Sequence, residues 1–196
     1  MNGLMVEGTA EQAIIDLLLK NDLLALSMDD LIQSPQNEFY QVGLNAKKFQ
    51  RNFLNHEFDN VCVHVVLDDP KKKLKLYNVN QLIYYVTREE IEAIQLYAYP
   101  GWKEQYLKFV KSNSKHKNID CKPSSFFKSE DGLGIKNIKK YDYVYNLWVN
   151  NISGLVNAIK SVRNEMHRKN SIQKCFNGRK KDKEVEYKYL ADLLVL

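Results

Sequence analysis

The chain has 196 residues, of which 44% are hydrophobic and 27% charged, and its formal net charge is +5. This composition is typical of a globular protein and excludes a fibrous or wholly disordered chain. No apolar run approaches the ~20 residues that a membrane span needs, and Glu7 and Glu11 interrupt the pattern of a secretion signal. We therefore expect a cytoplasmic protein of one domain, with or without a small appendage, that does not bind membranes.

The charge is distributed unevenly along the chain. Residues 1–100 carry 9 Lys and Arg against 14 Asp and Glu, whereas residues 101–196 carry 20 against 10. An acidic half beside a basic half suits a metal centre next to a surface that binds a polyanion such as nucleic acid. Solvated lysines would produce a similar count, so the asymmetry alone does not decide the function.

In the first half of the chain, strand patterns alternate with helix patterns. Short apolar runs predict strands over residues 4–6, 23–27, 60–67 and 81–86. Apolar residues at helical spacing predict helices between them, ending near Lys20 and Phe58 and starting after Thr87. The 60–67 run is almost continuously apolar, as expected for a central strand covered on both faces. The sequence therefore predicts an α/β fold with a compact, mostly parallel four-stranded sheet flanked by helices.

After Pro100 and Gly101 the pattern becomes mainly helical. Helices are predicted over residues 102–110, 122–127, 141–148, 152–166 and 184–194, with a polar, basic connection at 167–183. We therefore divide the chain into an α/β core, residues 1–98, and a helical, basic C-terminal extension, residues 99–196, that packs on the core.

Cysteine and histidine residues are scattered along the sequence. Cys62, Cys121 and Cys175 lie far apart and form no Cys-x-x-Cys motif, so neither a disulfide framework nor a zinc site is supported. We expect reduced thiols, with Cys62 buried in a strand and no Cys-His nucleophile pair. His64 lies within an apolar run, where a histidine is more often a core residue than a ligand. The chain also has no Gly-rich phosphate loop and no Gly-x-Ser-x-Gly motif.

Acidic side chains follow each predicted strand, and those after three of the strands are candidate metal ligands. They are Glu7 and Glu11 after the first strand, Asp68 and Asp69 after the 60–67 strand, and Glu90 and Glu92 after the last. The carboxyl ends of parallel strands meet at one sheet edge, where ligands collect. Carboxylates gathered there suit Mg²⁺ or Mn²⁺, which supports phosphodiester hydrolysis. The structural alternatives are contacts with helix amino termini for the glutamates and a turn before Pro70 for the aspartates.

Two of these strand ends carry a resemblance to a known family. Val6-Glu7-Gly8-x-x-Glu11 ends the first strand, and Val65-Val66-Leu67-Asp68-Asp69 ends the central one. Together these motifs resemble the Toprim fold of topoisomerases, bacterial primases and related nucleases, over roughly residues 3–90. Looser similarity at residues 87–92, 122–127 and 139–144 extends to the small OLD-type, abortive-infection Toprim proteins of bacterial phage-defence loci.

The resemblance implies a Mg²⁺-dependent nuclease that acts on DNA or RNA in phage defence, beside an ATPase partner protein. It assigns the catalytic roles to Glu7 and Asp68, both of them metal ligands, with Glu11 and Asp69 in support. Pro70 occupies the position of the family's second Asp, so we expect Asp69, Glu90 or Glu92 to complete the metal site. The same proline supports a second hypothesis, a catalytically silent Toprim-derived module that binds a partner protein or nucleic acid.

Basic side chains are expected to hold the phosphates of the nucleic acid, because they supply most of its sequence-independent affinity. They are Lys71, Lys72, Lys73, Arg163, Arg168, Lys169, Arg179, Lys180 and Lys181. A charge run is more often a solvated surface, which is the structural alternative for this set.

Overall fold

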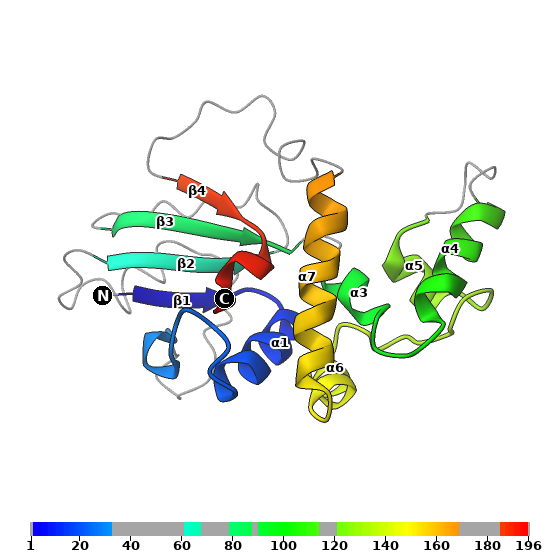
Figure 1. Cartoon of the computed structure of the whole chain (residues 1–196), viewed down its shortest axis with the longest axis horizontal. Helices are drawn as coiled ribbons and strands as arrows, with labels where there is room; N and C mark the ends of the chain where they lie inside the picture. The colour runs from blue at the N-terminus through cyan, green and yellow to red at the C-terminus, as the bar shows by residue number, and fades with distance from the viewer. Residues whose placement is uncertain are drawn as a thin grey trace.

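The structure, a computed structural model, describes residues 2–32, 61–67, 79–87, 90–113, 121–168 and 185–195. Its strands are β1 (Asn2–Val6), β2 (Val61–Leu67), β3 (Val79–Val86) and β4 (Val185–Lys188). They form one four-stranded sheet in the order β1-β2-β3-β4, and every neighbouring pair is parallel (Figure 1). The predicted α/β fold with a parallel four-stranded sheet is confirmed.

The fourth strand comes from a different part of the chain than predicted. The predicted helix over residues 184–194 is wrong, because β4 and the 3₁₀-helix η3 (Leu190–Leu193) form there. The predicted strand over residues 23–27 is also wrong. These residues precede the 3₁₀-helix η1 (Met28–Asp30), and Leu24 makes only an isolated antiparallel bridge with Leu194. The sheet is therefore completed by the C-terminal segment.

One large apolar core joins the sheet to three of the helices. Helix α1 (Thr9–Lys20) follows β1 directly, and its fully buried Ile14 and Leu18 share the core with Leu4 of β1. The helices α6 (Tyr141–Trp148) and α7 (Ile152–Arg168) contribute Trp148 and Ile159 to this core. These three helices agree with the sequence prediction, because each has apolar residues at helical spacing.

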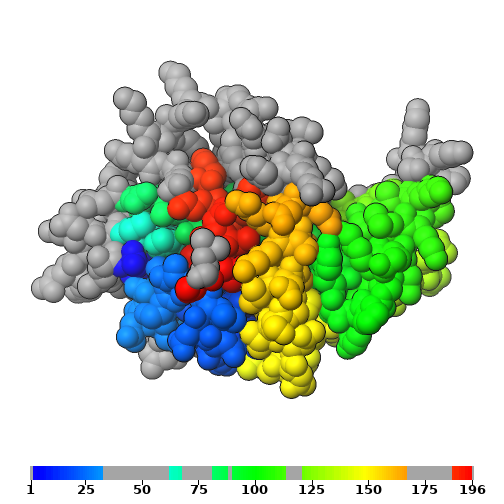
Figure 2. All heavy atoms as spheres, in the orientation of Figure 1, coloured from blue at the N-terminus to red at the C-terminus, as the bar shows by residue number. Residues whose placement is uncertain are grey.

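A second, smaller core lies on the far side of α7 from the sheet. It forms where α4 (Trp102–Asn113) and α5 (Pro123–Lys128) pack aromatic rings, with Phe109, Phe126 and Phe127 at its centre. Figures 1 and 2 show α4 and α5 as a separate lobe beside the long α7. No helix in the described ranges has the length and apolarity that a membrane span requires.

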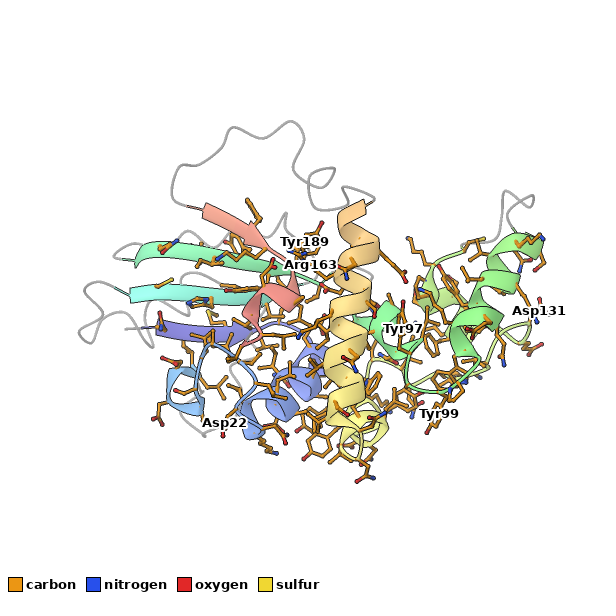
Figure 3. The ribbon with its side chains drawn as sticks, in the orientation of Figure 1. Asp22, Tyr97, Tyr99, Asp131, Arg163 and Tyr189 are labelled. Carbon is orange, nitrogen blue, oxygen red and sulfur yellow. The ribbon has the colours of Figure 1, made fainter. Side chains whose placement is uncertain are left out.

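Polar contacts join this lobe to α7. The Glu165 carboxylate on α7 accepts a hydrogen bond from the Tyr97 hydroxyl and pairs with Lys103 Nζ of α4 at 2.7 Å. The same ammonium lies 4.9 Å from the centre of the Tyr97 ring, which favours its charge. Tyr97 lies between α7 and the lobe in Figure 3.

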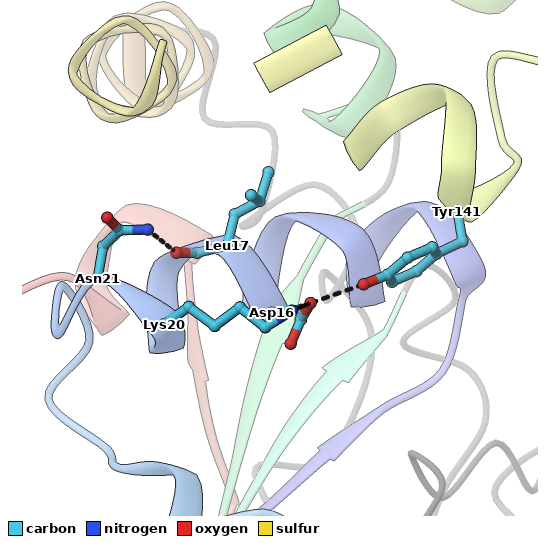
Figure 4. Close-up of polar contacts among 5 residues, drawn as sticks. All are labelled: Asp16, Leu17, Lys20, Asn21 and Tyr141. Atoms are coloured by element: carbon cyan, nitrogen blue, oxygen red, sulfur yellow. Dashed lines mark hydrogen bonds and ion pairs between the residues drawn. The ribbon is translucent and has the colours of Figure 1, made fainter. Parts of the chain in front are cut away.

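Helix α1 is joined to α6 through a buried carboxylate. Asp16 is only 4% exposed, and its Oδ2 accepts a hydrogen bond of 2.6 Å from the Tyr141 hydroxyl (Figure 4). Lys20 Nζ pairs with the same oxygen at 2.7 Å from the exposed end of the helix. A buried carboxylate needs such partners, because an uncompensated charge in the interior is costly.

Replacing Tyr141 by Phe should lower the free energy of unfolding by about 1.5–3 kcal/mol, because it removes a hydrogen bond to a buried charge. Urea denaturation measures the loss. Tyr143→Phe on the same helix is the control, since the structure gives its hydroxyl no hydrogen bond within the described ranges, and it should change stability by less than about 0.5 kcal/mol. Equal losses in the two variants would contradict this account.

Candidate functional site

The carboxyl ends of β1, β2 and β3 meet at one edge of the sheet. The Glu7 backbone N–H donates to the Val66 carbonyl at 2.9 Å, and the Thr87 N–H donates to the Leu67 carbonyl at 2.9 Å. The ladder therefore continues one residue past β1 and β3 and places Glu7 and Thr87 on either side of the end of β2. Asp68 follows Leu67 in the chain, and both Asp68 and Asp69 lie outside the described residues.

Glu7 follows the end of β1, as the sequence pattern predicts, and its side chain is half-buried. Its neighbour along the sheet edge is the end of β2, because Val6 pairs with Val66 in the parallel register. The backbone therefore confirms the predicted position of Glu7 beside the strand that precedes Asp68.

Glu11 lies in the first turn of α1, and its side chain lies beside Gly8 in the turn after β1. Its side chain is 8% exposed, and Oε1 accepts a hydrogen bond of 3.1 Å from the buried hydroxyl of Thr87. A Cβ at Gly8 would lie 2.0 Å from Glu11 Oε2, so the carboxylate occupies the space that the glycine leaves open. Glu11 thus connects α1 to the end of β3 across the candidate edge.

Glu92 lies in an ion pair within α3 (Glu90–Gln95). Its carboxylate is 7% exposed and pairs with Lys139 Nζ at 2.8 Å. The Lys139 carbonyl accepts a hydrogen bond from Thr9 Oγ1, and the Gln95 amide donates to the Ile138 carbonyl. These contacts fasten the loop before α6 to α1 and α3. Glu92 therefore has a structural role, because its ion pair with Lys139 holds this loop against α3.

Glu90 is fully buried and faces the C-terminal segment. Burial raises the pKa of the Glu90 carboxyl to about 8; the Leu190 backbone amide lowers it, and the nearby Asp192 carboxylate adds to the rise. Neither carboxyl oxygen makes a hydrogen bond of normal geometry to the described residues. The side chain is therefore mostly protonated at neutral pH and packs against η3.

The described acids do not converge on a single metal-binding group. Within the part of the chain that the structure describes, no three Asp, Glu, His or Cys side chains are placed to hold one cation. Glu11 and Thr87 are brought together, whereas Glu90 and Glu92 have neighbours on η3 and on the loop before α6. Glu7 is thus the described acid that best fits the predicted ligand role.

Of the predicted phosphate-binding residues, the structure describes the side chain of Arg163. It approaches Asp192 Oδ1 at 3.4 Å and lies 6.0 Å from the centre of the Tyr189 ring (Figure 3). Arg168 ends α7, and its side chain is outside the described part. The other predicted positions also lie outside the described ranges: Lys71, Lys72, Lys73, Lys169, Arg179, Lys180 and Lys181.

A polar cluster that the sequence reasoning missed lies on the sheet face toward α1. Cys62 Sγ is 3.5 Å from His64 Nε2, and His64 Nδ1 is 3.0 Å from the Tyr85 hydroxyl. The sequence predicts no Cys-His nucleophile pair, yet Cys62 and His64 lie in contact, and Cys62 is half-buried rather than buried. The Cys-x-His spacing was the available signal, because residues i and i+2 of a strand lie on the same face.

No family model, no curated protein and no solved structure matches this chain. The Toprim resemblance therefore rests on the motif residues themselves and remains a hypothesis.

Gly8→Ala should displace the Glu11 carboxylate and break its bond to Thr87, with a loss of about 1.5–3 kcal/mol in the free energy of unfolding. The Gly8 backbone, with φ of −102°, is itself compatible with alanine. In a Glu11→Ala background the same substitution should therefore cost less than about 0.5 kcal/mol. Urea denaturation of the four proteins measures this coupling, and additive losses would exclude it.

Glu90→Gln should stabilise the protein at alkaline pH and not at acid pH. The unfolded carboxyl ionises near pH 4.5 and the folded one near 8, so wild-type stability falls as pH rises between these values. The advantage of the variant should be near zero at pH 4.5 and on the order of 5 kcal/mol by pH 9.

Denaturation at several pH values measures this dependence. Glu92→Gln, which removes the Lys139 ion pair, is the control and should lose stability at both pH 6 and pH 9. A Glu90→Gln effect that does not change with pH would show that the carboxyl is ionised in the folded protein.

Proposed function

We propose that this protein is a metal-dependent nuclease of Toprim type that hydrolyses phosphodiester bonds of DNA or RNA with Mg²⁺ or Mn²⁺. The observation that supports the proposal is the hydrogen bond from the Glu7 amide to the Val66 carbonyl. It fixes an acidic residue at the carboxyl end of β1, beside the strand that ends one residue before Asp68. Crevices at this edge of parallel sheets are where α/β proteins bind ligands.

The donor set at this edge suits a hard divalent cation. Mg²⁺ binds through one or two carboxylates and keeps water ligands for a phosphate, so Glu7 and Asp68 would be sufficient protein ligands. A bound cation supplies charge stabilisation for the phosphoryl group and an activated water. Glu7 is half-buried, so its carboxylate can also exchange a proton with a reacting group at the mouth of the edge.

Glu11 and Thr87 would support the geometry of this site through the hydrogen bond between them. Their hydrogen bond spans the end of β2 and connects the amino-terminal turn of α1 to β3. Rigid support of this kind matters because catalytic side chains must be held close to their productive geometry. The role in phage defence, the cytoplasmic location, the bacterial origin and the ATPase partner remain proposals that follow from the resemblance.

A second function, a catalytically silent module that binds a partner protein or nucleic acid, is favoured by one observation. Three of the described acids make contacts that support the fold. Glu11 contacts Thr87, Glu92 pairs with Lys139, and Glu90 is buried against η3. With Pro70 at the position of the family's second Asp, few of the acids that the structure describes are available for catalysis.

Nuclease assays with plasmid, single-stranded DNA and tRNA separate the two functions. Cleavage should require Mg²⁺ or Mn²⁺, and Glu7→Gln or Asp68→Asn should reduce it by roughly 100-fold or more, because each removes a ligand of the cation. Glu104→Gln, an exposed acid on α4, is the matched control and should retain full activity.

Equal behaviour of wild type, Glu7→Gln and Asp68→Asn on every substrate would overturn the nuclease proposal. Gel-shift assays of the same proteins with the same nucleic acids then test the binding module, whose affinity should not depend on the cation.

A further inference from the structure

The cluster of Cys62, His64 and Tyr85 has the arrangement of a nucleophile, a base and a group that orients the base. The thiol and the imidazole are 3.5 Å apart, and the Tyr85 hydroxyl is 3.0 Å from the other imidazole nitrogen. The His64 and Tyr85 rings also stack, with centres 5.8 Å apart and an interplanar angle of 19°. Thiols in such an arrangement can be activated by the adjacent base.

The surroundings of His64 keep its imidazole in the form that accepts a proton. Burial lowers its pKa from the usual value, and the positive charge of Lys188 on β4 lowers it further, whereas Asp30 of η1 raises it. The imidazole is therefore neutral at physiological pH. When its proton is on Nδ1 and donated to the Tyr85 oxygen, the Nε2 lone pair faces Cys62.

Cys62 is accessible and lies away from the candidate metal edge. Its side chain is half-buried, and its sulfur lies 3.8 Å from Oε1 of Gln81, an exposed residue on β3. Cys62 is the second residue of β2, whereas Leu67 ends that strand, which separates the two sites by about 16 Å at the usual rise per residue.

We propose that Cys62 is an oxidation site, a thiol that His64 activates for reaction with peroxides. His64 Nε2 takes the thiol proton as the sulfur attacks one peroxide oxygen. The O–O bond breaks, and the leaving hydroxide receives the proton from His64 and departs as water. The sulfur is oxidised to a sulfenic acid and the peroxide is reduced. The reaction does not depend on the proposed nuclease activity.

Tyr85 acts as a positioning residue in this reaction. Its hydroxyl holds the imidazole plane toward Cys62, and its stacked ring limits rotation of His64. Tyr85→Phe keeps the ring and removes the hydroxyl. It should slow the oxidation of Cys62 by several-fold and change how the oxidation rate of Cys62 depends on pH.

The test treats the full-length protein with hydrogen peroxide, traps sulfenic acid with dimedone and measures each cysteine peptide by mass spectrometry. Cys121 is the internal reference, because it is also half-buried but lies two residues before α5 begins, outside the sheet. Cys62 should react about tenfold faster than Cys121, and His64→Gln should remove this difference.

The pH profile of wild-type Cys62 keeps the proposal testable if His64→Gln fails to fold. The rate should already be high at neutral pH and fall as His64 becomes protonated, below its usual pKa near 6.5. The proposal is overturned if Cys62 reacts no faster than Cys121, if His64→Gln leaves its rate unchanged, or if the rate rises only near pH 8.5, as for an ordinary thiol.

Discussion

The hydrogen bonds that extend the ladder past β1 and β3 fix the geometry on which the candidate site depends. Through the Val66 and Leu67 carbonyls they place Glu7 on one side of the end of β2 and Thr87 on the other. Glu11 then spans this distance to reach Thr87, in space that Gly8 leaves open. Two backbone hydrogen bonds and one side-chain bond therefore connect three consecutive strand ends to α1.

The parts of the fold that the sequence predicted correctly have strong local patterns. The apolar run before Asp68 becomes the interior strand β2, and the helical spacing of α1, α6 and α7 matches their buried faces. The C-terminal segment was misassigned because β4 has only four residues, too few to establish a period of two. Leu190, Leu193 and Leu194 have helical spacing, yet they form a 3₁₀ turn and a bridge to Leu24.

The candidate site was predictable only in part, because the partners of its acids are set by tertiary structure. Its position after a strand correctly predicted that Glu7 lies at the carboxyl edge of the sheet, since the backbone alone decides which edge it reaches. The same rule failed to show that Glu92 pairs with Lys139 or that Glu90 faces Asp192, which lies about a hundred residues later. Cys62 and His64, by contrast, share a strand face at a spacing that is visible in the sequence.

The proposed nuclease function requires that Glu7 and Asp68 bind one divalent cation at the carboxyl edge of the sheet. Anomalous diffraction from crystals grown with Mn²⁺ tests it directly. A single peak should appear at this edge, with a carboxylate oxygen of each residue at about 2.1 Å from the metal. A map with no peak between these side chains, or an Asp68 carboxylate directed away from Glu7, would contradict it.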